Sequence, residues 1–113
     1  MTFEAYYGIT GSTATIHLTG ELPERRVPAL RGLVEQALQR PLNRLVLRVH
    51  GLRSICAGGV RCLAHTQQLL PRGAQITVDG AGTAVRRALT AAGLDTAMTL
   101  TDDPTHTTGP AGA

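Results

Sequence analysis

A cysteine, an alanine and two glycines, Cys56, Ala57, Gly58 and Gly59, stand where an alternating, strand-like stretch ends and a helical pattern begins. A thiol at a helix N-terminus is a candidate redox sensor, because the positive end of the helix dipole stabilises the thiolate. Glycines at such a junction also let backbone N–H groups approach a phosphate. The simpler interpretation is that small side chains close the start of a helix.

The sequence contains few features that would indicate catalysis or nucleotide binding. The chain has no G-x-x-x-x-G-K-[ST] or G-x-G-x-x-G motif, and it lacks the G-x-S-x-G and H-E-x-x-H patterns. The acidic residues are scattered at Glu4, Glu21, Glu24, Glu35, Asp79, Asp95, Asp102 and Asp103. We therefore expect a protein that is not an enzyme and has no cofactor, with weak anion binding at a helix N-terminus as an alternative.

Neither the cysteines nor the histidines are spaced as a metal site requires. Cys56 and Cys62 are too few for a disulfide framework, and they are expected to be small, buried or half-buried residues in a reducing compartment. His17 and His50, together with Arg48, could share the polar face of a sheet and form an anion or metal patch. The alternative is that these three side chains are only the solvated residues of an exposed face, so no metal is expected.

Composition restricts the class of protein further. The 113 residues are 42% hydrophobic and 17% charged, which fits one domain with an aliphatic core. The 11 basic residues are all arginine, giving a net charge of +3, but they are spread out and not interleaved with aromatic residues, so nucleic acid is not expected as a partner. No stretch predicts membrane insertion or a signal peptide, and we expect a cytoplasmic protein.

Alternating apolar and polar residues predict strands in four places. These are residues 13–19, 44–50, 75–79 and 96–100, and residues 3–10 are counted as a further edge strand. Alternation with period two predicts a sheet with one dry face and one wetter face. A sheet covered on both faces would instead contain continuous apolar runs.

Helical patterns separate these strands, at residues 25–40, 58–70 and 82–92, with Gly93 at the position of a left-handed cap. Strands that alternate with helices indicate parallel pairing through right-handed crossovers. The sequence therefore predicts a single α/β domain at residues 1–100, with a mixed sheet of four or five strands. About three helices should pack on one face, and the other face should be largely exposed to solvent. Residues 101–113 are expected to be disordered.

Four segments give the sequence a family resemblance. They are A-T-I-H-L-T-G-E-L at residues 14–22, L-N-R-L-V-L-R-V-H-G-L at 42–52, the stretch from Ile55 to Gly80, and V-R-R-A-L-T-A-A-G-L-D at 85–95. Over residues 3–100 the chain resembles the STAS domain of bacterial anti-sigma factor antagonists. The T-G-E-L segment, expected as a turn after the second strand, and the G-L-D ending are characteristic. The resemblance implies a mixed sheet with helices mainly on one face.

The resemblance also implies a regulatory site that is altered here. Family members carry D-S-S-G or a close variant at the start of the second helix, and a partner that is both an anti-sigma factor and a kinase phosphorylates the first serine. The matching residues are Cys56, Ala57, Gly58 and Gly59, so a methyl group replaces the hydroxyl that would accept phosphate. Cys56 replaces a capping aspartate, a loss expected to cost about 1 kcal/mol.

Two further positions depart from the family pattern. In addition, one nearby hydroxyl is an alternative acceptor of phosphate. Pro23 stands where an aspartate commonly follows G-E-L, and Arg48 stands where an acidic residue or asparagine is common. Ser54 is the nearest hydroxyl to the missing acceptor, although it precedes the start of the helix. Ser54 is therefore kept as an alternative, displaced phosphoacceptor.

These observations predict a non-catalytic, protein-binding regulator that binds an anti-sigma factor and Ser kinase of ATPase fold without a phospho-switch. The predicted partner-binding surface consists of Glu21, Leu22, Pro23, Cys56, Ala57, Gly58, Gly59 and Arg61. The alternative is a STAS scaffold or accessory subunit of a signalling or transport complex, where phosphorylation is not needed. The sequence also leaves open whether the protein forms a homodimer.

Overall fold

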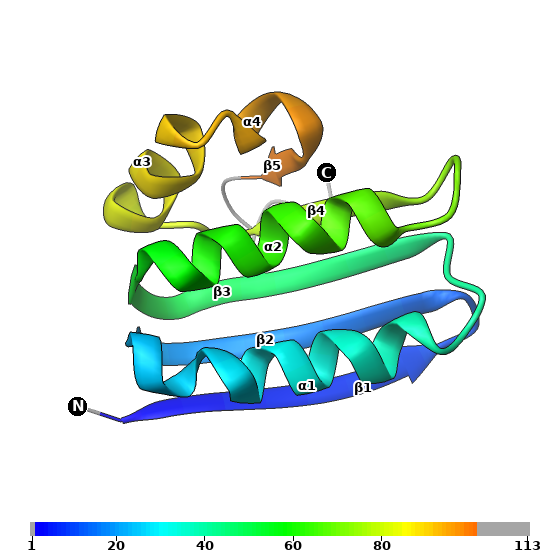
Figure 1. Cartoon of the computed structure of the whole chain (residues 1–113), viewed down its shortest axis with the longest axis horizontal. Helices are drawn as coiled ribbons and strands as arrows, with labels where there is room; N and C mark the ends of the chain where they lie inside the picture. The colour runs from blue at the N-terminus through cyan, green and yellow to red at the C-terminus, as the bar shows by residue number, and fades with distance from the viewer. Residues whose placement is uncertain (1, 102–113) are drawn as a thin grey trace, which may run out of the picture.

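The computed structural model describes residues 2–101 and contains one five-stranded sheet (Figure 1). The strands are β1 (Phe3–Thr10), β2 (Thr13–Leu22), β3 (Arg44–Ile55), β4 (Gln75–Asp79) and β5 (Thr99–Thr101). They lie in the order β1-β2-β3-β4-β5; β1 is antiparallel to β2, and the other pairs are parallel. The prediction of a mixed sheet is confirmed.

Helices connect the parallel strands, and Figure 1 shows α1 and α2 lying together across one face of the sheet. The helical elements are the 3₁₀ turn η1 (Glu24–Arg26), α1 (Val27–Leu38), α2 (Ala57–Leu69), α3 (Thr83–Ala91) and the single turn α4 (Leu94–Ala97). Because successive parallel strands are neighbours, right-handed crossovers place every helix on the same face. The expected one-sided arrangement of helices is therefore confirmed.

The core lies between this face and the helices. Alternate strand residues such as Ile16, Leu47 and Ile76 are buried there, and they meet Leu30 of α1 and Leu89 of α3. The buried side chains form one cluster that is almost entirely aliphatic. Residues on the opposite face of the same strands are half-buried or exposed, apart from Asp79, as period-two alternation predicts.

The second and third strands are longer than predicted, and the T-G-E-L segment is part of β2 and is not a turn after it. Gly20 has φ +89°, a left-handed conformation that suits glycine, and the β2–β3 register shifts between Gly20 and Glu21. Beyond this irregularity the pairing resumes, with Glu21 opposite Ser54 and Leu22 opposite Ile55. After this irregularity, both strands therefore continue as a pair up to the start of α2.

The last predicted strand is displaced toward the C-terminus. Gly93 has the expected left-handed conformation, with φ +77°, but the chain then forms α4. The Thr96 hydroxyl donates to the Gly93 carbonyl at 2.9 Å and stabilises this turn, so the predicted strand residues Thr96 and Ala97 are helical. Thr101, predicted to begin a disordered tail, belongs to β5, and residues 102–113 lie outside the described part of the chain.

Candidate functional site

The ends of β2 and β3 bring the two predicted site segments together at the start of α2. Leu22 and Ile55 are paired across the strands, and the Cys56 N–H donates to the Leu22 carbonyl at 3.1 Å. After this hydrogen bond the chain turns from β3 directly into α2 at Ala57. Residues of the G-E-L-P segment therefore lie against the Cys-Ala-Gly-Gly junction.

Cys56 is the N-cap residue of α2, with extended backbone angles of φ −78° and ψ 168°. Its Sγ accepts a hydrogen bond from the Gly59 N–H at 3.3 Å, and its carbonyl accepts from the Val60 N–H at 3.1 Å. Sulfur is a weaker acceptor than a carboxylate, yet it takes up one of the free N–H groups at the helix start. The expectation that the cap is lost was wrong.

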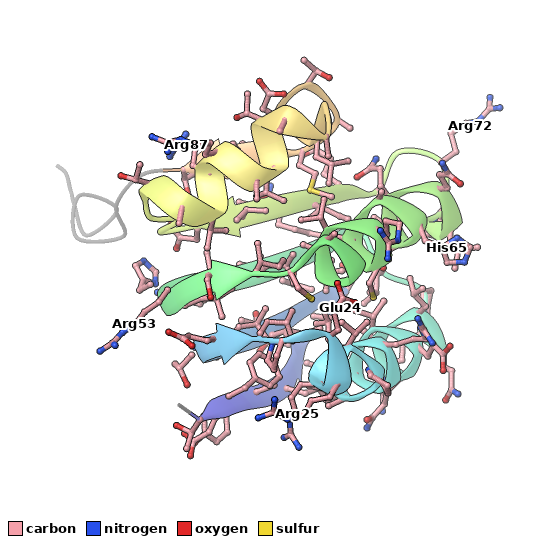
Figure 2. The ribbon with its side chains drawn as sticks, turned by 60° about the vertical axis from the view of Figure 1, so that its left-hand side comes forward. Glu24, Arg25, Arg53, His65, Arg72 and Arg87 are labelled. Carbon is pink, nitrogen blue, oxygen red and sulfur yellow. The ribbon has the colours of Figure 1, made fainter. Side chains whose placement is uncertain are left out.

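Glu24, which the sequence did not single out, provides a second acceptor at this helix start. Its Oε2 accepts from the Gly58 N–H at 3.0 Å, although the two residues are 34 positions apart. Figure 2 shows Glu24 between α1 and α2. A Cβ atom on Gly58 would overlap Oε1 at the flexible end of the Glu24 side chain, so the carboxylate would have to move from this position. Anions are favoured at a helix N-terminus, and here the chain supplies its own.

The predicted surface residues differ in exposure. Ala57 and Arg61 are exposed; Glu21, Pro23 and Cys56 are half-buried; Leu22, Gly58 and Gly59 are buried. Leu22 is only 2% exposed because it belongs to the core. A Cβ on Gly59 would lie 2.7 Å from Leu22 Cδ2 and 2.8 Å from Ile55 Cγ1, so this glycine lets α2 approach the strand ends. The prediction that these three buried residues belong to a contact surface is corrected. They lie beneath the surface and hold the start of α2 against the strand ends.

Ser54, the alternative acceptor, lies in β3 before the helix and is half-buried opposite Glu21. Pro23 is the residue before η1, and its carbonyl accepts from the Arg26 N–H at 3.0 Å. Pro23 thereby helps to form the turn that holds Glu24 next to α2. Pro23, which departs from the family pattern, is thus next in the chain to Glu24, whose carboxylate accepts a hydrogen bond from the start of α2.

A groove of about 490 Å³ runs from this site between α1 and α2. Val34 and Leu38 of α1 and Cys62 of α2 contribute apolar lining, and Glu24 and Arg61 lie along it. Burial raises the pKa of the Cys62 thiol, an effect that the charge of Arg31 partly opposes. Cys62 is therefore a neutral core thiol at physiological pH, and both cysteines are free.

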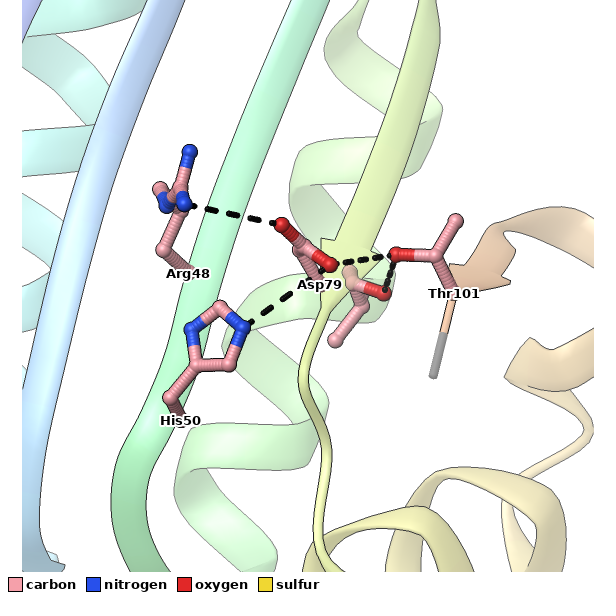
Figure 3. Close-up of polar contacts among 5 residues, drawn as sticks. Arg48, His50, Asp79 and Thr101 are labelled. Atoms are coloured by element: carbon pink, nitrogen blue, oxygen red, sulfur yellow. Dashed lines mark hydrogen bonds and ion pairs between the residues drawn. The ribbon is translucent and has the colours of Figure 1, made fainter. Parts of the chain in front are cut away.

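A separate polar cluster lies on the open face of the sheet (Figure 3). The Thr101 hydroxyl donates to Asp79 Oδ1 at 2.7 Å, while Arg48 Nη2 and His50 Nε2 each lie 3.9 Å from the Asp79 carboxylate. His17 is paired with Arg48, so His17 lies on the same face as this cluster. Sequence reasoning missed Asp79, whose carboxylate connects β3 to β4 and β5.

The cluster does not have the composition of a metal site. Within residues 2–101, no group of three or more His, Cys, Asp or Glu side chains is arranged to hold a metal ion. In the same part of the chain, no helix is both long enough and apolar enough to span a membrane.

Comparisons with known proteins agree with this architecture. An anti-sigma factor antagonist from Mycobacterium paratuberculosis is 21% identical with a TM-score of 0.81, and the match covers 91% of this chain and 86% of that chain. The antagonist SpoIIAA in its unphosphorylated form is 21% identical with a TM-score of 0.74, covering 88% and 87%. Bacillus SpoIIAA in its phosphorylated form is 20% identical with a TM-score of 0.66, covering 88% and 90%.

Among curated proteins, no sequence matches this chain. The family model described as "Mlab, STAS domain" matches residues 6–102, which is most of the sequence. The one-sided α/β sheet fits that assignment. This chain belongs to the STAS domain family.

Proposed function

We propose that the chain is a non-catalytic, cytoplasmic regulator that binds an anti-sigma factor and Ser kinase of ATPase fold without being phosphorylated. Its contact region is the α2-start surface, defined as Glu21, Pro23, Glu24, Cys56, Ala57 and Arg61. The observation that carries the proposal is Ala57, which is exposed at the first helical position and has no hydroxyl. The similarity to anti-sigma factor antagonists supports this role.

The physical consequence of Ala57 is a surface whose charge does not change by covalent modification at that position. In a phosphorylatable protein, about −1.5 to −2 units of charge are added at a contact surface, which changes both repulsion and desolvation. A methyl group cannot accept this charge. Binding is therefore controlled by the concentration of the two proteins or by the state of the partner.

The second candidate function is a STAS scaffold or accessory subunit of a signalling or transport complex. The same residue favours it, because a subunit that is held permanently has no need for a phosphoacceptor at position 57. The two candidates differ in the partner that they require. A regulator binds an ATPase-fold protein with kinase activity, whereas a scaffold or accessory subunit binds a component of a larger assembly.

In the experiment, a tagged form of this chain is used to recover its partner from the source cell. The partner is then purified, and the chain and the partner are incubated together with ATP. We expect the intact mass of the chain to be unchanged and its dissociation constant, measured by calorimetry, to be the same before and after incubation. One phosphate per chain, on Ser54 or elsewhere, would contradict the proposal. A partner without an ATPase fold would support the scaffold or accessory subunit.

A further inference from the structure

β1 is an edge strand of the sheet, on the side of α1 that faces away from α2 (Figure 1). Among the described residues it pairs with β2 alone, over eight residues and without a register shift. Proteins usually protect a sheet edge with proline, charged residues such as lysine, a bulge or a very short strand. β1 contains one charged residue, Glu4, and none of the other features, whereas β5 at the opposite edge has only three residues. Within residues 2–101, the β1 edge is therefore available for pairing with another extended segment.

The turn between β1 and β2 determines which backbone groups of β1 face outward. Gly11 and Ser12 form a two-residue turn with Gly11 at φ +60°, and in such a turn the flanking residues, here Thr10 and Thr13, are hydrogen-bonded to each other. Hydrogen-bonded and non-hydrogen-bonded residues alternate along an antiparallel pair. The backbone N–H and C=O groups that face away from β2 thus belong to four alternate residues, Phe3, Ala5, Tyr7 and Ile9.

Hollows lie along this edge, between β1 and α1. One of about 470 Å³ has an apolar lining from Phe3 and Ala5 of β1 and from Ala29 and Leu33 of α1. Another, of about 420 Å³, lies farther along the strand beside Tyr7. Side chains of an added strand alternate between the two faces of the sheet, so those on the α1 side would enter these hollows. The first hollow suits an aliphatic side chain.

Arginines lie along the same edge. Arg26 lines the first hollow, where its Cζ atom is 5.9 Å from the centroid of the Phe3 ring, and Arg40 lines the second. Arg25, labelled in Figure 2, lines a further hollow beside Phe3. All three arginines are exposed, and none forms an ion pair with another of the residues that the structure describes. The edge thus carries positive charge that no neighbouring carboxylate neutralises.

The acidic residues closest to this edge have other contacts. Glu4 accepts a hydrogen bond from the Tyr6 hydroxyl at 3.0 Å on the exposed face of β1. Glu24 accepts from the Gly58 N–H of α2, and Glu35 lines the groove on the other side of α1. A second copy of β1 would bring the same arginines to the edge and be repelled, whereas an acidic segment would be attracted.

We propose that the β1 edge and α1 form a second docking site, which binds an extended acidic segment of a partner protein as a sixth strand of the sheet. This β1-edge site is defined as Phe3, Ala5, Tyr7, Ile9, Arg26 and Arg40. The segment pairs with the outward backbone groups of β1, and its aliphatic side chains on the α1 side occupy the hollows. Its acidic side chains lie near Arg26 and Arg40. The inference does not depend on the function proposed for the α2-start surface.

The test titrates the isotope-labelled chain with the synthetic peptide acetyl-ETVTVTE-amide and follows the backbone amide resonances by NMR. Its glutamates and valines share one face of a strand, as the site requires. We expect the outward amides of Ala5, Tyr7 and Ile9 to shift and to exchange more slowly with solvent, while those of Tyr6 and Gly8, which face β2, change less. The basic peptide acetyl-KTVTVTK-amide should bind at least about tenfold more weakly at low salt, because repulsion replaces two ion pairs.

Arg26→Gln should weaken binding of the acidic peptide by about threefold, as expected for loss of one exposed ion pair. Arg72→Gln is the matched control, because it removes an exposed arginine from the turn before β4 and should leave the affinity unchanged. The same spectra show whether each variant is folded.

Three results would overturn the inference. One is the absence of shifts at millimolar acidic peptide, and another is equal affinity for the acidic and basic peptides. The third is slow exchange of the outward amides in the chain alone that increases with its concentration, since β1 would then pair with a second copy. Only synthetic peptides enter this measurement, so its failure is distinguishable from failure of the partner experiment at the α2-start surface.

Discussion

Replacing Gly20 with alanine is expected to lower the free energy of unfolding by about 2–5 kcal/mol. At φ +89° a side chain is strained, and the new Cβ would also overlap the backbone carbonyl oxygen of Thr2. A backbone atom cannot move aside as a flexible side chain can. Because Gly20 lies next to the register shift after which β2 continues to Leu22, the start of α2 should lose order together with the strand.

Gly73→Ala is the matched control for this substitution. Gly73 has nearly the same backbone conformation, with φ +88°, but a Cβ there would meet no atom within 4 Å. Only the backbone strain remains, which costs about 1–2 kcal/mol. Urea unfolding of both variants measures the difference, and equal losses of stability would show that the close approach of Thr2 to Gly20 is not important.

Ala57→Arg is expected to weaken partner binding by at least about 100-fold, a loss of roughly 2.7 kcal/mol in binding free energy. Ala57 is exposed at the first position of α2, so the fold tolerates the larger side chain, which would fill space in the contact region that we propose. Desolvating an unpaired charge within an interface adds to this steric cost. Calorimetry with the purified partner measures the change.

Gln68→Arg controls for the added charge, because Gln68 is exposed near the opposite end of the same helix. It should leave the dissociation constant within about twofold of wild type, since charges outside an interface contribute little. Thermal unfolding checks that both variants fold. If the two arginine variants bind the partner equally well, the start of α2 is not the contact region.

Much of the fold could be predicted because its signals are local. Alternation in the strands placed Ile16, Leu47 and Ile76 on the buried face, and the same pattern required that the helices cover only one side. The final strand was misplaced because residues 96–100 also alternate. There the Thr96 hydroxyl hydrogen bond to Gly93 favours a helical turn over an extended chain.

The candidate site was only partly predictable, because its decisive contacts join distant parts of the chain. Spacing placed Cys56 and Ala57 at the helix start, but nothing in the sequence near Gly58 indicates that Glu24 caps it. The capping-box pattern relates residues three positions apart and cannot detect a glutamate that comes from another element. The burial of Gly59 likewise depends on Leu22, which only the pairing of β2 with β3 reveals.

Hydrogen exchange of the chain with and without its purified partner, followed by mass spectrometry, shows directly which surface is covered. If this protein docks through the start of α2, exchange should slow in the segments that contain Glu21 to Glu24 and Cys56 to Arg61. The open face of the sheet, represented by Thr15 and His17, should exchange at an unchanged rate. Protection of that open face, with unchanged exchange around Ala57, would contradict the docking site proposed for this protein.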